Sequence, residues 1–534
     1  MTVTRRAFVT GAVGALGAAV TGTVVGTTAT ASPRGTAGPR RVALTREDHR
    51  VLIIGSGFGG GVASLRFAEA GVPVTVLERG RRWPSGPNST TFPSATAPDE
   101  RLLWYGSGTN LFGRPLDVGR YAGLVEAVPG ENMTVLCPAG VGGGSLVYQG
   151  MTLQPAKDVF LTQFPEELDW DLMNRVHYPR VARMLGLEVA PDALIESPTY
   201  AAPRAFAANA RRAGQPVSKI PMPIDWQFAL DELAGKMRPS YTNGDGAMGV
   251  NNGGKHSVDV TYLAAAEATG FVDVRSLHHV TDVERATDGR WTVYVERIDE
   301  RGTVLENLIL TAGTLVMAAG TMNTTRLLMR AAAAGRIPDL PDALGRGWGS
   351  NADRIYAWST AEHDFGPVQG GPVVYGSLDW SNPRTASTVI QASMPQLGIN
   401  EHTTVLVGYG VSDARGHFVY DAAKDDAILR WPYEGDAAIQ TSTIGPRVQA
   451  IAGPGSVLID TNAAFPSTWH PLGGASMNAV CDLDGRVLGQ RGLYVLDGAL
   501  IPGNCAACNP SMTIAAVAER AMDSIIARDV GTVV

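Results

Sequence analysis

A glycine-rich turn that follows a buried strand restricts the fold of this chain more than any other feature. Residues 51–54 are a continuous run of apolar side chains, which predicts a strand buried on both faces. Gly55, Gly57 and Gly60 follow in the spacing G-x-G-x-x-G. In such a turn the first glycine permits a tight bend and the second lets backbone approach a pyrophosphate. The third lets the following helix pack closely on the strand.

The residues after this turn complete a compact unit. Residues 63–70 have helical spacing, and residues 74–77 predict a second strand that ends at Glu78. A carboxylate at that place can bind ribose hydroxyls. Together these features predict a βαβ unit that binds a dinucleotide. A glycine-rich surface turn is the alternative, but it would leave Glu78 unexplained.

Composition narrows the class of protein. The 534 residues, 45% of them hydrophobic, are enough for a large core, and we expect two interleaved domains. A net charge of −7 without a basic block argues against nucleic acid as a partner. Cys505 and Cys508 have the spacing of redox or metal ligands, but no two further ligands are evident. We predict no metal site and interpret both cysteines as small buried side chains, with a disulfide left open.

The first 32 residues have the features of an export signal. Arg5 and Arg6 precede a weakly apolar run that ends at Ala29 and Ala31, a small-x-small cleavage pattern. This resembles a twin-arginine signal, which directs folded, cofactor-loaded proteins to the export machinery. A frayed N-terminal tail is the alternative. We expect residues 33–47 to form a linker, and we expect an exported rather than a cytoplasmic protein.

Candidate catalytic residues lie late in the chain. His470 is followed by Pro471, Leu472 and two glycines, and Asn509 precedes Pro510. A positioned imidazole can take a hydroxyl proton, and an amide can donate a hydrogen bond to a developing alkoxide. His470 alone could equally be a buried structural histidine. A second glycine cluster at residues 140–145 predicts another close approach of backbone to a flat ring or a phosphate, with a flexible loop as the alternative.

These motifs resemble those of the glucose–methanol–choline (GMC) FAD oxidoreductases, in the branch that contains bacterial cholesterol oxidases. The matching segments occur in order along the chain, at residues 55–59, 140–147, 255–264, 347–349, 470–474, 484–487, 493–503, 509–510 and 513–520. The resemblance implies an α/β fold in which an FAD-binding Rossmann-type domain is interleaved with a mixed-sheet α+β substrate domain. We expect the first domain to comprise residues 48–160, 241–350 and 456–534, and the second to comprise residues 161–240 and 351–455.

The resemblance also implies roles for single residues. His470 would face the flavin as the base, and Asn509 would orient the substrate oxygen. Glu78 would bind the adenosine ribose, Val280 would lie beside the adenine, and Asp497 would lie near the ribityl and phosphate groups. The full set implied for FAD is Gly55, Gly57, Gly60, Glu78, Gly142, Gly143, Gly144, Ser145, Val280, Asp497 and Gly498.

The expected reaction is oxidation of an alcohol to an aldehyde or ketone at FAD, with dioxygen reduced to hydrogen peroxide. Cholesterol oxidases of this branch carry a glutamate that shuttles a proton during double-bond isomerisation. Gln391 is nearest that place here, and an amide cannot shuttle a proton. Residues 351–455 also hold 11 Asp and Glu against 6 Lys and Arg. This is usual for a solvated face, but it is also compatible with a cationic or polyhydroxylated substrate.

We therefore predict a sugar hydroxymethyl substrate, as in aminoglycoside antibiotic biosynthesis, with Gln391 as a substrate residue. Export argues against this prediction, because such pathways run mainly inside the cell. A 3β-hydroxysteroid oxidase without efficient isomerase activity is the first alternative. An FAD dehydrogenase that uses another acceptor is the second. A catalytically silent flavoprotein is the third, and the presence of both His470 and Asn509 argues against it.

Overall fold

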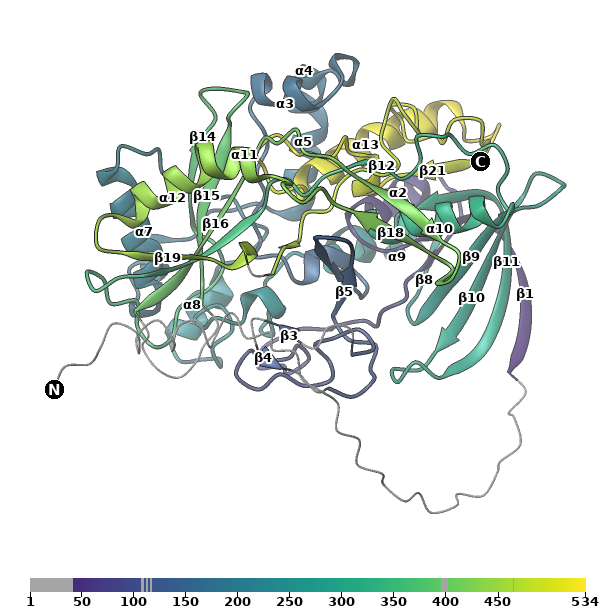
Figure 1. Ribbon diagram of the computed structural model, residues 1–534. Helices are drawn as coiled ribbons and strands as arrows, with labels where there is room; N and C mark the ends of the chain where they lie inside the picture. Colours follow the sequence, from purple (N-terminus) through teal and green to yellow (C-terminus); the bar gives the residue numbers. More distant parts are fainter. Residues whose placement is uncertain (1–41, 107–109, 112–113, 116–117, 395–401, 464) are drawn as a thin grey trace, which may run out of the picture.

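The computed structural model describes residues 42–534 apart from residues 107–109, 112–113, 116–117, 395–401 and 464 (Figure 1). The predicted export signal lies outside the described residues. Strand β1 spans Ala43–Ile54, so residues 43–47 belong to a strand and not to the linker that we predicted. Their sequence is polar, but their backbone pairs in parallel with the long strand β11, Val304–Met317, from Ala43 opposite Glu306 onwards. The start of β1 is therefore a strand because it pairs with β11, and not because its sequence has a hydrophobic pattern.

The first sheet contains the predicted dinucleotide-binding unit. Its strand order is β8 (Val272–Arg275), β2 (Val74–Leu77), β1, β11, β10 (Trp291–Ile298) and β9 (His278–Arg285), with β21 (Leu493–Val495) also paired to β11. β8, β2, β1, β11 and β21 are mutually parallel, whereas β10 and β9 are antiparallel additions. The last four residues of β1 are fully buried, as expected for a parallel strand covered on both faces.

Helix α2, Phe58–Glu69, follows the glycine turn and packs on the long C-terminal helix α13, Ser511–Arg528. A side chain at Gly59 is excluded, because its Cβ would lie 1.6 Å from the carbonyl oxygen of Leu496. The predicted βαβ unit is therefore confirmed, although its helix begins at residue 58 rather than 63. Helix α10, Thr321–Ala333, follows β11 and contacts β9.

The second sheet is antiparallel. Its order is β19 (Val457–Asp460), β13 (Arg354–Ser359), β16 (Thr403–Gly410), β15 (Ser387–Ala392), β14 (Tyr375–Asp379) and β7 (Ser218–Lys219). One face is covered by α7 (Ala201–Arg212) and α12 (Gly445–Ala452), which pack against Val389 and Leu406. The neighbouring residues Ile390 and Val407 therefore point to the other face. Figure 1 shows this sheet at the opposite side of the molecule from β9, β10 and β11.

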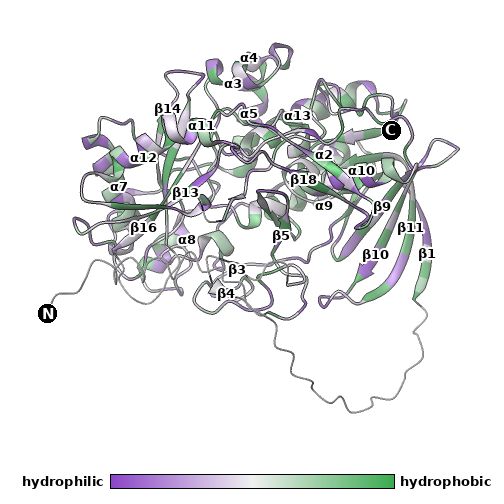
Figure 2. Ribbon diagram, viewed as in Figure 1, coloured by the Kyte–Doolittle hydropathy of each residue, from purple (hydrophilic) through white to green (hydrophobic). Residues whose placement is uncertain are grey.

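The remaining strands and helices connect the two sheets. They are β3 (Asn110–Leu111), β4 (Arg114–Pro115), β5 (Val125–Pro129), β6 (Thr134–Pro138), β12 (Arg346–Trp348), β17 (Gly416–Asp421), β18 (Asp426–Arg430), β20 (Ser467–Thr468), α3 (Lys157–Gln163), α4 (Trp170–Leu172), α5 (Tyr178–Leu185), α6 (Asp192–Ile195), α8 (Gln227–Leu233), α9 (Ala264–Ala268) and α11 (Ala437–Ile439). Figure 2 shows mixed hydrophobic and hydrophilic colour on the outer helices α7 and α12. In the described part of the chain, no helix is both long enough and apolar enough to span a membrane.

Two predicted domain boundaries need correction. Helices α3 and α5 lie within the predicted substrate segment or at its edge, but Phe160, Tyr178 and Leu185 belong to the core of the first sheet. Their apolar faces are buried against α13 and its neighbours instead of against the second sheet. Strand β19, which we expected in the FAD domain, pairs with β13 in the second sheet.

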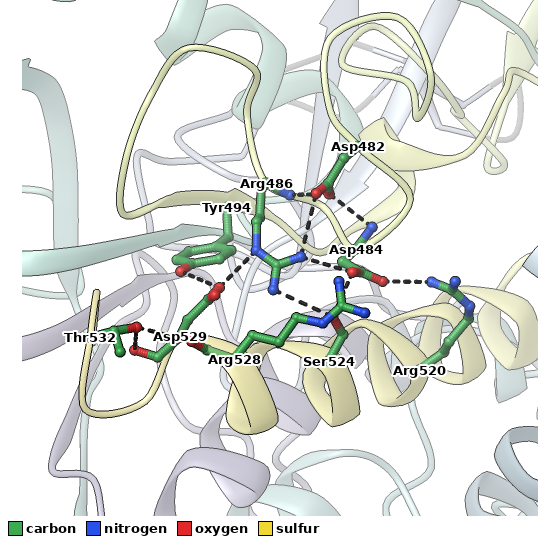
Figure 3. A network of polar contacts seen from close by, with 9 residues as sticks. All are labelled: Asp482, Asp484, Arg486, Tyr494, Arg520, Ser524, Arg528, Asp529 and Thr532. Atoms are coloured by element: carbon green, nitrogen blue, oxygen red, sulfur yellow. Dashed lines mark hydrogen bonds and ion pairs between the residues drawn. The ribbon is translucent and has the colours of Figure 1, made fainter.

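A polar network fixes the end of α13 to the loop before β21 (Figure 3). Arg486 contacts Asp482 (3.3 Å), Asp484 (2.8 Å) and Asp529 (2.7 Å). The Tyr494 hydroxyl also donates to Asp529, at 2.8 Å. The network attaches the last helix to the strand that completes the first sheet.

Candidate active site

A single cavity of about 1230 Å³ runs between the two sheets. It is lined at one end by the glycine turn, Glu78 and Val280, and at the other by His470 and side chains of β15 and β16. Ligand pockets usually enclose roughly 300–1,000 Å³. The cavity is therefore large enough for a cofactor and a substrate together.

Glycines open the cofactor end of the cavity. A Cβ on Gly57 would meet no atom closer than 3.9 Å, and one on Gly144 would meet none within 4 Å. Both residues line the cavity, so any side chain there would occupy space that backbone now leaves to a ligand. Gly143 adopts φ 55°, and a Cβ there would lie 2.8 Å from the Cα of Gly57. The two glycine loops can therefore meet only because both lack side chains.

Glu78 lies where β2 ends, next to these loops. Its carboxylate accepts hydrogen bonds from the Ser56 hydroxyl (2.6 Å) and from the backbone N–H groups of Gly80 (2.8 Å) and Gly140 (3.2 Å). The carboxylate is fixed in place and still lines the cavity. A bare backbone cradle, a helix N-terminus and a fixed carboxylate fit the pyrophosphate and ribose of FAD.

Asp497 continues this surface. It accepts from the backbone N–H of Gly320 (2.9 Å) and Ala499 (2.8 Å) and from the Thr324 hydroxyl (2.5 Å). Burial raises the pKa of Asp497 to about 6, against the opposing effect of these hydrogen bonds. Asp497 and Gly498 line the cavity as expected from their predicted place beside FAD.

Three residues of the predicted FAD set lie behind the cavity surface. A Cβ on Gly60 would lie 2.1 Å from the Gly55 carbonyl oxygen, so Gly60 serves the packing of α2 on the turn. Gly142 has φ 109°, which a residue with a side chain rarely adopts. The Ser145 hydroxyl donates to the Gly142 carbonyl (2.7 Å) and accepts from the Val258 N–H (2.9 Å). Gly60, Gly142 and Ser145 shape the loops instead of lining the cavity.

His470 follows β20 and lines the cavity. Its Nδ1 lies 2.8 Å from Oδ1 of Asp353, a side chain that is only 5% exposed. Thr468 completes a closed set of contacts, since its hydroxyl lies 2.7 Å from Oδ2 of Asp353 and 3.0 Å from the His470 backbone nitrogen. The ring of Tyr409 meets the imidazole edge-on at 5.8 Å between centroids. One face and one nitrogen of the imidazole are thus fixed by protein.

Asp353 and Thr468 were not predicted. The sequence gives a weak signal for Asp353, which comes four residues after Gly349 of a matching motif. Nothing in their spacing connects residue 353 with residue 470. The pairing arises because β13 begins beside the loop that carries His470.

Asn509 lines the cavity, but its amide is already engaged. Nδ2 donates to the Met151 carbonyl (2.6 Å) and to the Ser511 hydroxyl (2.7 Å), and Oδ1 accepts from the Leu153 N–H (3.2 Å). An amide nitrogen has two hydrogens, and both are used here. The predicted donation to a substrate oxygen therefore needs correction. In this conformation Asn509 fixes residues 151–153 against the start of α13.

Family comparison agrees with this geometry. A family model described as GMC oxidoreductase matches residues 436–518, which include His470 and Asn509. A cholesterol oxidase of Mycobacterium tuberculosis (strain ATCC 25618 / H37Rv) is 28% identical, over 89% of this chain and 91% of that protein. A cholesterol oxidase of Acinetobacter baumannii is 26% identical, over 91% of this chain and 96% of that protein. The C-terminal segment therefore matches a GMC oxidoreductase domain, and the chain is similar to cholesterol oxidases over most of its length.

Solved structures show the same fold. Pyridoxine 4-oxidase from Mesorbium loti superimposes with a TM-score of 0.61 and 16% identity, over 89% of this chain and 99% of that one. A fungal aryl-alcohol oxidase superimposes with a TM-score of 0.61 and 14% identity, over 90% of this chain and 99% of that one. These similarities support an FAD-dependent enzyme that acts on CH–OH groups, which agrees with the reaction class and the cofactor expected from the motifs.

Gln391 does not face the cavity, which corrects its predicted role as a substrate residue. Its Nε2 donates to the Ala392 carbonyl (2.8 Å) and the Thr404 hydroxyl (2.9 Å) within the sheet. Ile390 and Ala392, one position to either side, line the cavity instead. Side chains alternate along a strand, so a shift of one residue exchanges the two faces.

The carboxylates on the cavity wall are all hydrogen-bonded to protein groups. Among the described residues they are Glu78, Glu126, Asp353, Asp426 and Asp497. Arg79 donates to Glu126 (2.6 Å), and Arg326 donates to Asp426 (2.9 Å). No group of three or more His, Cys, Asp or Glu side chains in the described ranges is arranged to hold a metal ion. All four cysteines, at positions 137, 481, 505 and 508, are buried free thiols.

Proposed function

We propose that this enzyme oxidises a hydroxyl group on a large apolar skeleton, of the 3β-hydroxysteroid type, with dioxygen as electron acceptor. The observation that carries the proposal is the wall beside His470. Ile390, Ala392, Val405 and Val407 line the cavity from β15 and β16, and Tyr409 continues the wall to the imidazole. Ile390 is opposite Val407, and Ala392 is opposite Val405. Together they form one continuous apolar surface.

This wall favours an apolar substrate over the sugar that the sequence suggested. Burial of apolar surface stabilises a complex by about 25 cal/mol per Å². A hydroxyl group buried without a hydrogen-bond partner costs roughly 1–3 kcal/mol by mutational data. A sugar would place several hydroxyls against valine and isoleucine side chains, and each would add this cost. The acidic balance of residues 351–455 gives no opposing argument, because among the described residues only Asp353 and Asp426 of that range line the cavity, and both are bonded to protein side chains.

The protein groups near His470 supply binding and proton transfer. The apolar wall orients the skeleton so that its hydroxyl reaches the imidazole, and exclusion of water strengthens polar contacts there. His470 accepts the hydroxyl proton on Nε2, since Nδ1 is bonded to Asp353. FAD, when bound, would supply the hydride acceptor, and its reoxidation by dioxygen with two protons would release hydrogen peroxide.

The proposed product is the unrearranged ketone. Isomerisation of a neighbouring double bond requires a group that removes a proton from one carbon and returns it to another. None of the described β15 and β16 side chains that line the cavity carries a carboxylate or an imidazole. The cholesterol oxidase names of the relatives support the substrate class but not this second step.

The experiment that tests the proposal is an anaerobic screen with the purified holoenzyme. Flavin absorbance should bleach on addition of cholesterol or another 3β-hydroxysteroid, and it should persist with an aminoglycoside or a simple sugar. Admission of air should restore the absorbance and release peroxide. Chromatography with ultraviolet detection of the conjugated enone should find the 5-en-3-one in excess over its isomer, the 4-en-3-one. Bleaching by the aminoglycoside alone would return the assignment to a polar hydroxymethyl, and restoration by quinone but not by air would identify a dehydrogenase.

A further inference from the structure

We infer that Asp353 is the positioning residue of the catalytic base, because it holds the proton of His470 on Nδ1 and leaves Nε2 as the acceptor for the substrate hydroxyl. The inference needs only the alcohol oxidation that defines the family and does not depend on the proposed steroid substrate. The sequence gives only a weak signal for this residue, which follows Gly349 of a matching motif by four positions.

The direction of each hydrogen bond follows from the contacts themselves. The His470 backbone N–H can only donate, so the Thr468 hydroxyl accepts it at 3.0 Å. That hydroxyl has one proton, and its nearest acceptor is Oδ2 of Asp353 at 2.7 Å, against 3.3 Å for the Ser350 carbonyl. Oδ2 is therefore an acceptor. An ionised carboxylate accepts at both oxygens, so Oδ1 accepts from Nδ1–H of His470 at 2.8 Å.

This arrangement decides the tautomer of the imidazole. A neutral imidazole has one N–H and one lone pair. With the proton on Nδ1, the lone pair lies on Nε2, the nitrogen left for the cavity. If the proton lay on Nε2, two lone-pair-bearing atoms would face each other at 2.8 Å, and His470 could not accept the substrate proton. Asp353 thus selects the basic tautomer before the substrate binds.

The position of Asp353 is itself fixed by the fold. It precedes β13, whose pairing with β16 begins at Arg354 opposite Gly408. Asn351 and Ala352, immediately before it, both have φ 57°, a backbone conformation that persists only where surrounding contacts impose it. Asn351 is held in turn by the backbone of Cys505 and Cys508. The carboxylate therefore cannot easily turn away from the imidazole.

The proposed step balances without a further reactant. The O–H bond of the alcohol breaks as Nε2–H forms, and bound FAD would accept the C–H electron pair as hydride, which would leave a C=O bond. His470 becomes an imidazolium, so its Nδ1–H···Oδ1 bond to the Asp353 carboxylate then joins two opposite charges and is strengthened by their attraction. Asp353 therefore stabilises His470 more strongly after the proton transfer than before it. An interaction that strengthens during the reaction increases its rate, whereas one of constant strength only improves substrate binding.

The first test observes the tautomer directly. We would label histidine with ¹⁵N in the holoenzyme and assign the His470 signals by their loss in His470→Gln. The expected spectrum has a protonated Nδ1 and an unprotonated Nε2. In Asp353→Asn the amide can donate to Nδ1, so we expect a shift of the proton towards Nε2. A proton on Nε2 in the wild-type protein, or an unchanged tautomer in Asp353→Asn, would overturn the inference.

The second test measures the reaction. A general base contributes typically ~10²–10⁴-fold to a rate, so Asp353→Asn should slow anaerobic bleaching by cholesterol about 100-fold or more at saturating substrate, with little change in the substrate concentration for half-saturation. The control is Asp436→Asn. Asp436 is equally buried and accepts from Ser350 on the same segment, but it has no contact with His470. The flavin of the Asp436→Asn variant should bleach at the wild-type rate.

A series of alcohols separates base positioning from a general structural defect. Fluorine beside the hydroxyl makes it more acidic, so it depends less on a base. The ratio of wild-type to Asp353→Asn rates should therefore fall along a series of 3β-hydroxysteroids of increasing hydroxyl acidity. A constant ratio, or equal slowing by Asp436→Asn, would assign Asp353 to folding alone. If no steroid bleaches the wild-type enzyme, the substrate proposal fails while the tautomer measurement still decides the role of Asp353.

Discussion

The side chain of Asn351 joins the two segments that carry the active-site residues, through a hydrogen bond to Cys508. Its Nδ2 donates to the Cys508 carbonyl (2.8 Å), and its Oδ1 accepts from the Cys505 N–H (3.1 Å). Between these cysteines Ala506 and Ala507 adopt φ 55° and 59°. The left-handed region costs a residue with a side chain roughly 1–2 kcal/mol. Asn351 therefore holds a strained turn that ends one residue before Asn509.

Replacement of this asparagine should lower stability. Asn351→Leu leaves a buried N–H and a buried carbonyl without partners, and each such group costs about 1–3 kcal/mol. We expect a loss of about 2–4 kcal/mol in urea unfolding of the holoenzyme. Ala507→Gly is the matched control in the same turn, because it removes the strain without removing a hydrogen bond. Ala507→Gly should unfold at the same urea concentration as the wild type or at a higher one. An equal loss of unfolding free energy in both variants would disprove the role of Asn351.

Adjacent residues of β15 should differ sharply in their effect on substrate binding. Ala392→Asp places a charge on the apolar cavity wall, where an unpaired carboxylate costs several kcal/mol, so KM for an apolar alcohol should rise at least about tenfold. Gln391→Met acts on the opposite face, so it should lower stability and leave KM unchanged. Steady-state peroxide assays check both. A rise in KM for Gln391→Met would mean that the two faces have been assigned wrongly.

Stability should fall on mild acidification because of His177. Burial lowers the pKa of this histidine from 6.5 to about 4, opposed by the attraction of Asp523 and assisted by repulsion from Arg180 and other arginines. Between pH 6.5 and 4 the unfolded chain binds a proton that the folded chain does not, so the free energy of unfolding decreases as the pH falls. His177→Phe should flatten this decline in urea titrations at pH 7 and pH 5. His417→Phe, at an exposed site on β17, should keep the wild-type slope.

The network around Arg486 should matter most at neutral pH (Figure 3). Arg486→Met leaves three carboxylates without their shared cation, and we expect a loss of about 2–4 kcal/mol at pH 7. Burial opposes ionisation of Asp484, but hydrogen bonds from Ser524 and Arg486 prevail and hold its pKa below 3.8. Ionised Asp484 therefore stabilises the fold above pH 3.8, and this stabilisation is lost as the pH falls further. The free energies of unfolding of the wild type and of Arg486→Met should converge in acid. Arg491→Met, at an exposed arginine, is the control and should have a small effect at every pH.

Export should depend on the first arginine pair. We expect Arg5→Lys combined with Arg6→Lys to retain the protein in the cytoplasm of a bacterial host that has twin-arginine translocation. Cell fractionation and immunoblotting measure this. Arg40→Lys with Arg41→Lys changes a second arginine pair beyond the signal, so it should be exported normally. Equal retention of both double variants would contradict the assignment.

Local pattern was sufficient to predict the cofactor half of the molecule. The strand before Gly55, the helix after it and Glu78 at the end of β2 form a continuous segment, and short-range geometry decides their arrangement. Gly57, Gly144, Val280 and Asp497 line the cavity where the family resemblance implied FAD contacts.

The substrate half depended on facts that no local pattern contains. The face of Gln391 follows from a strand register, and a shift of one residue reverses it. The contact of Asp353 with His470 joins positions 117 residues apart. The saturation of the Asn509 amide depends on the carbonyl of Met151, which belongs to a distant loop. Tertiary structure alone brings these groups together.

The arrangement of β1, β11 and β21 has a consequence for biosynthesis. β1 is made early and pairs with β11 on one side, whereas β21 pairs with the C-terminal part of β11 on its other side. While the ribosome is still translating residues 318–492, the edge of Leu315–Met317 on that side lacks its partner strand. Exposed apolar strand edges invite pairing with other chains. The nascent enzyme should therefore need protection by a chaperone until β21 arrives, and it should acquire FAD only after that strand has closed the sheet.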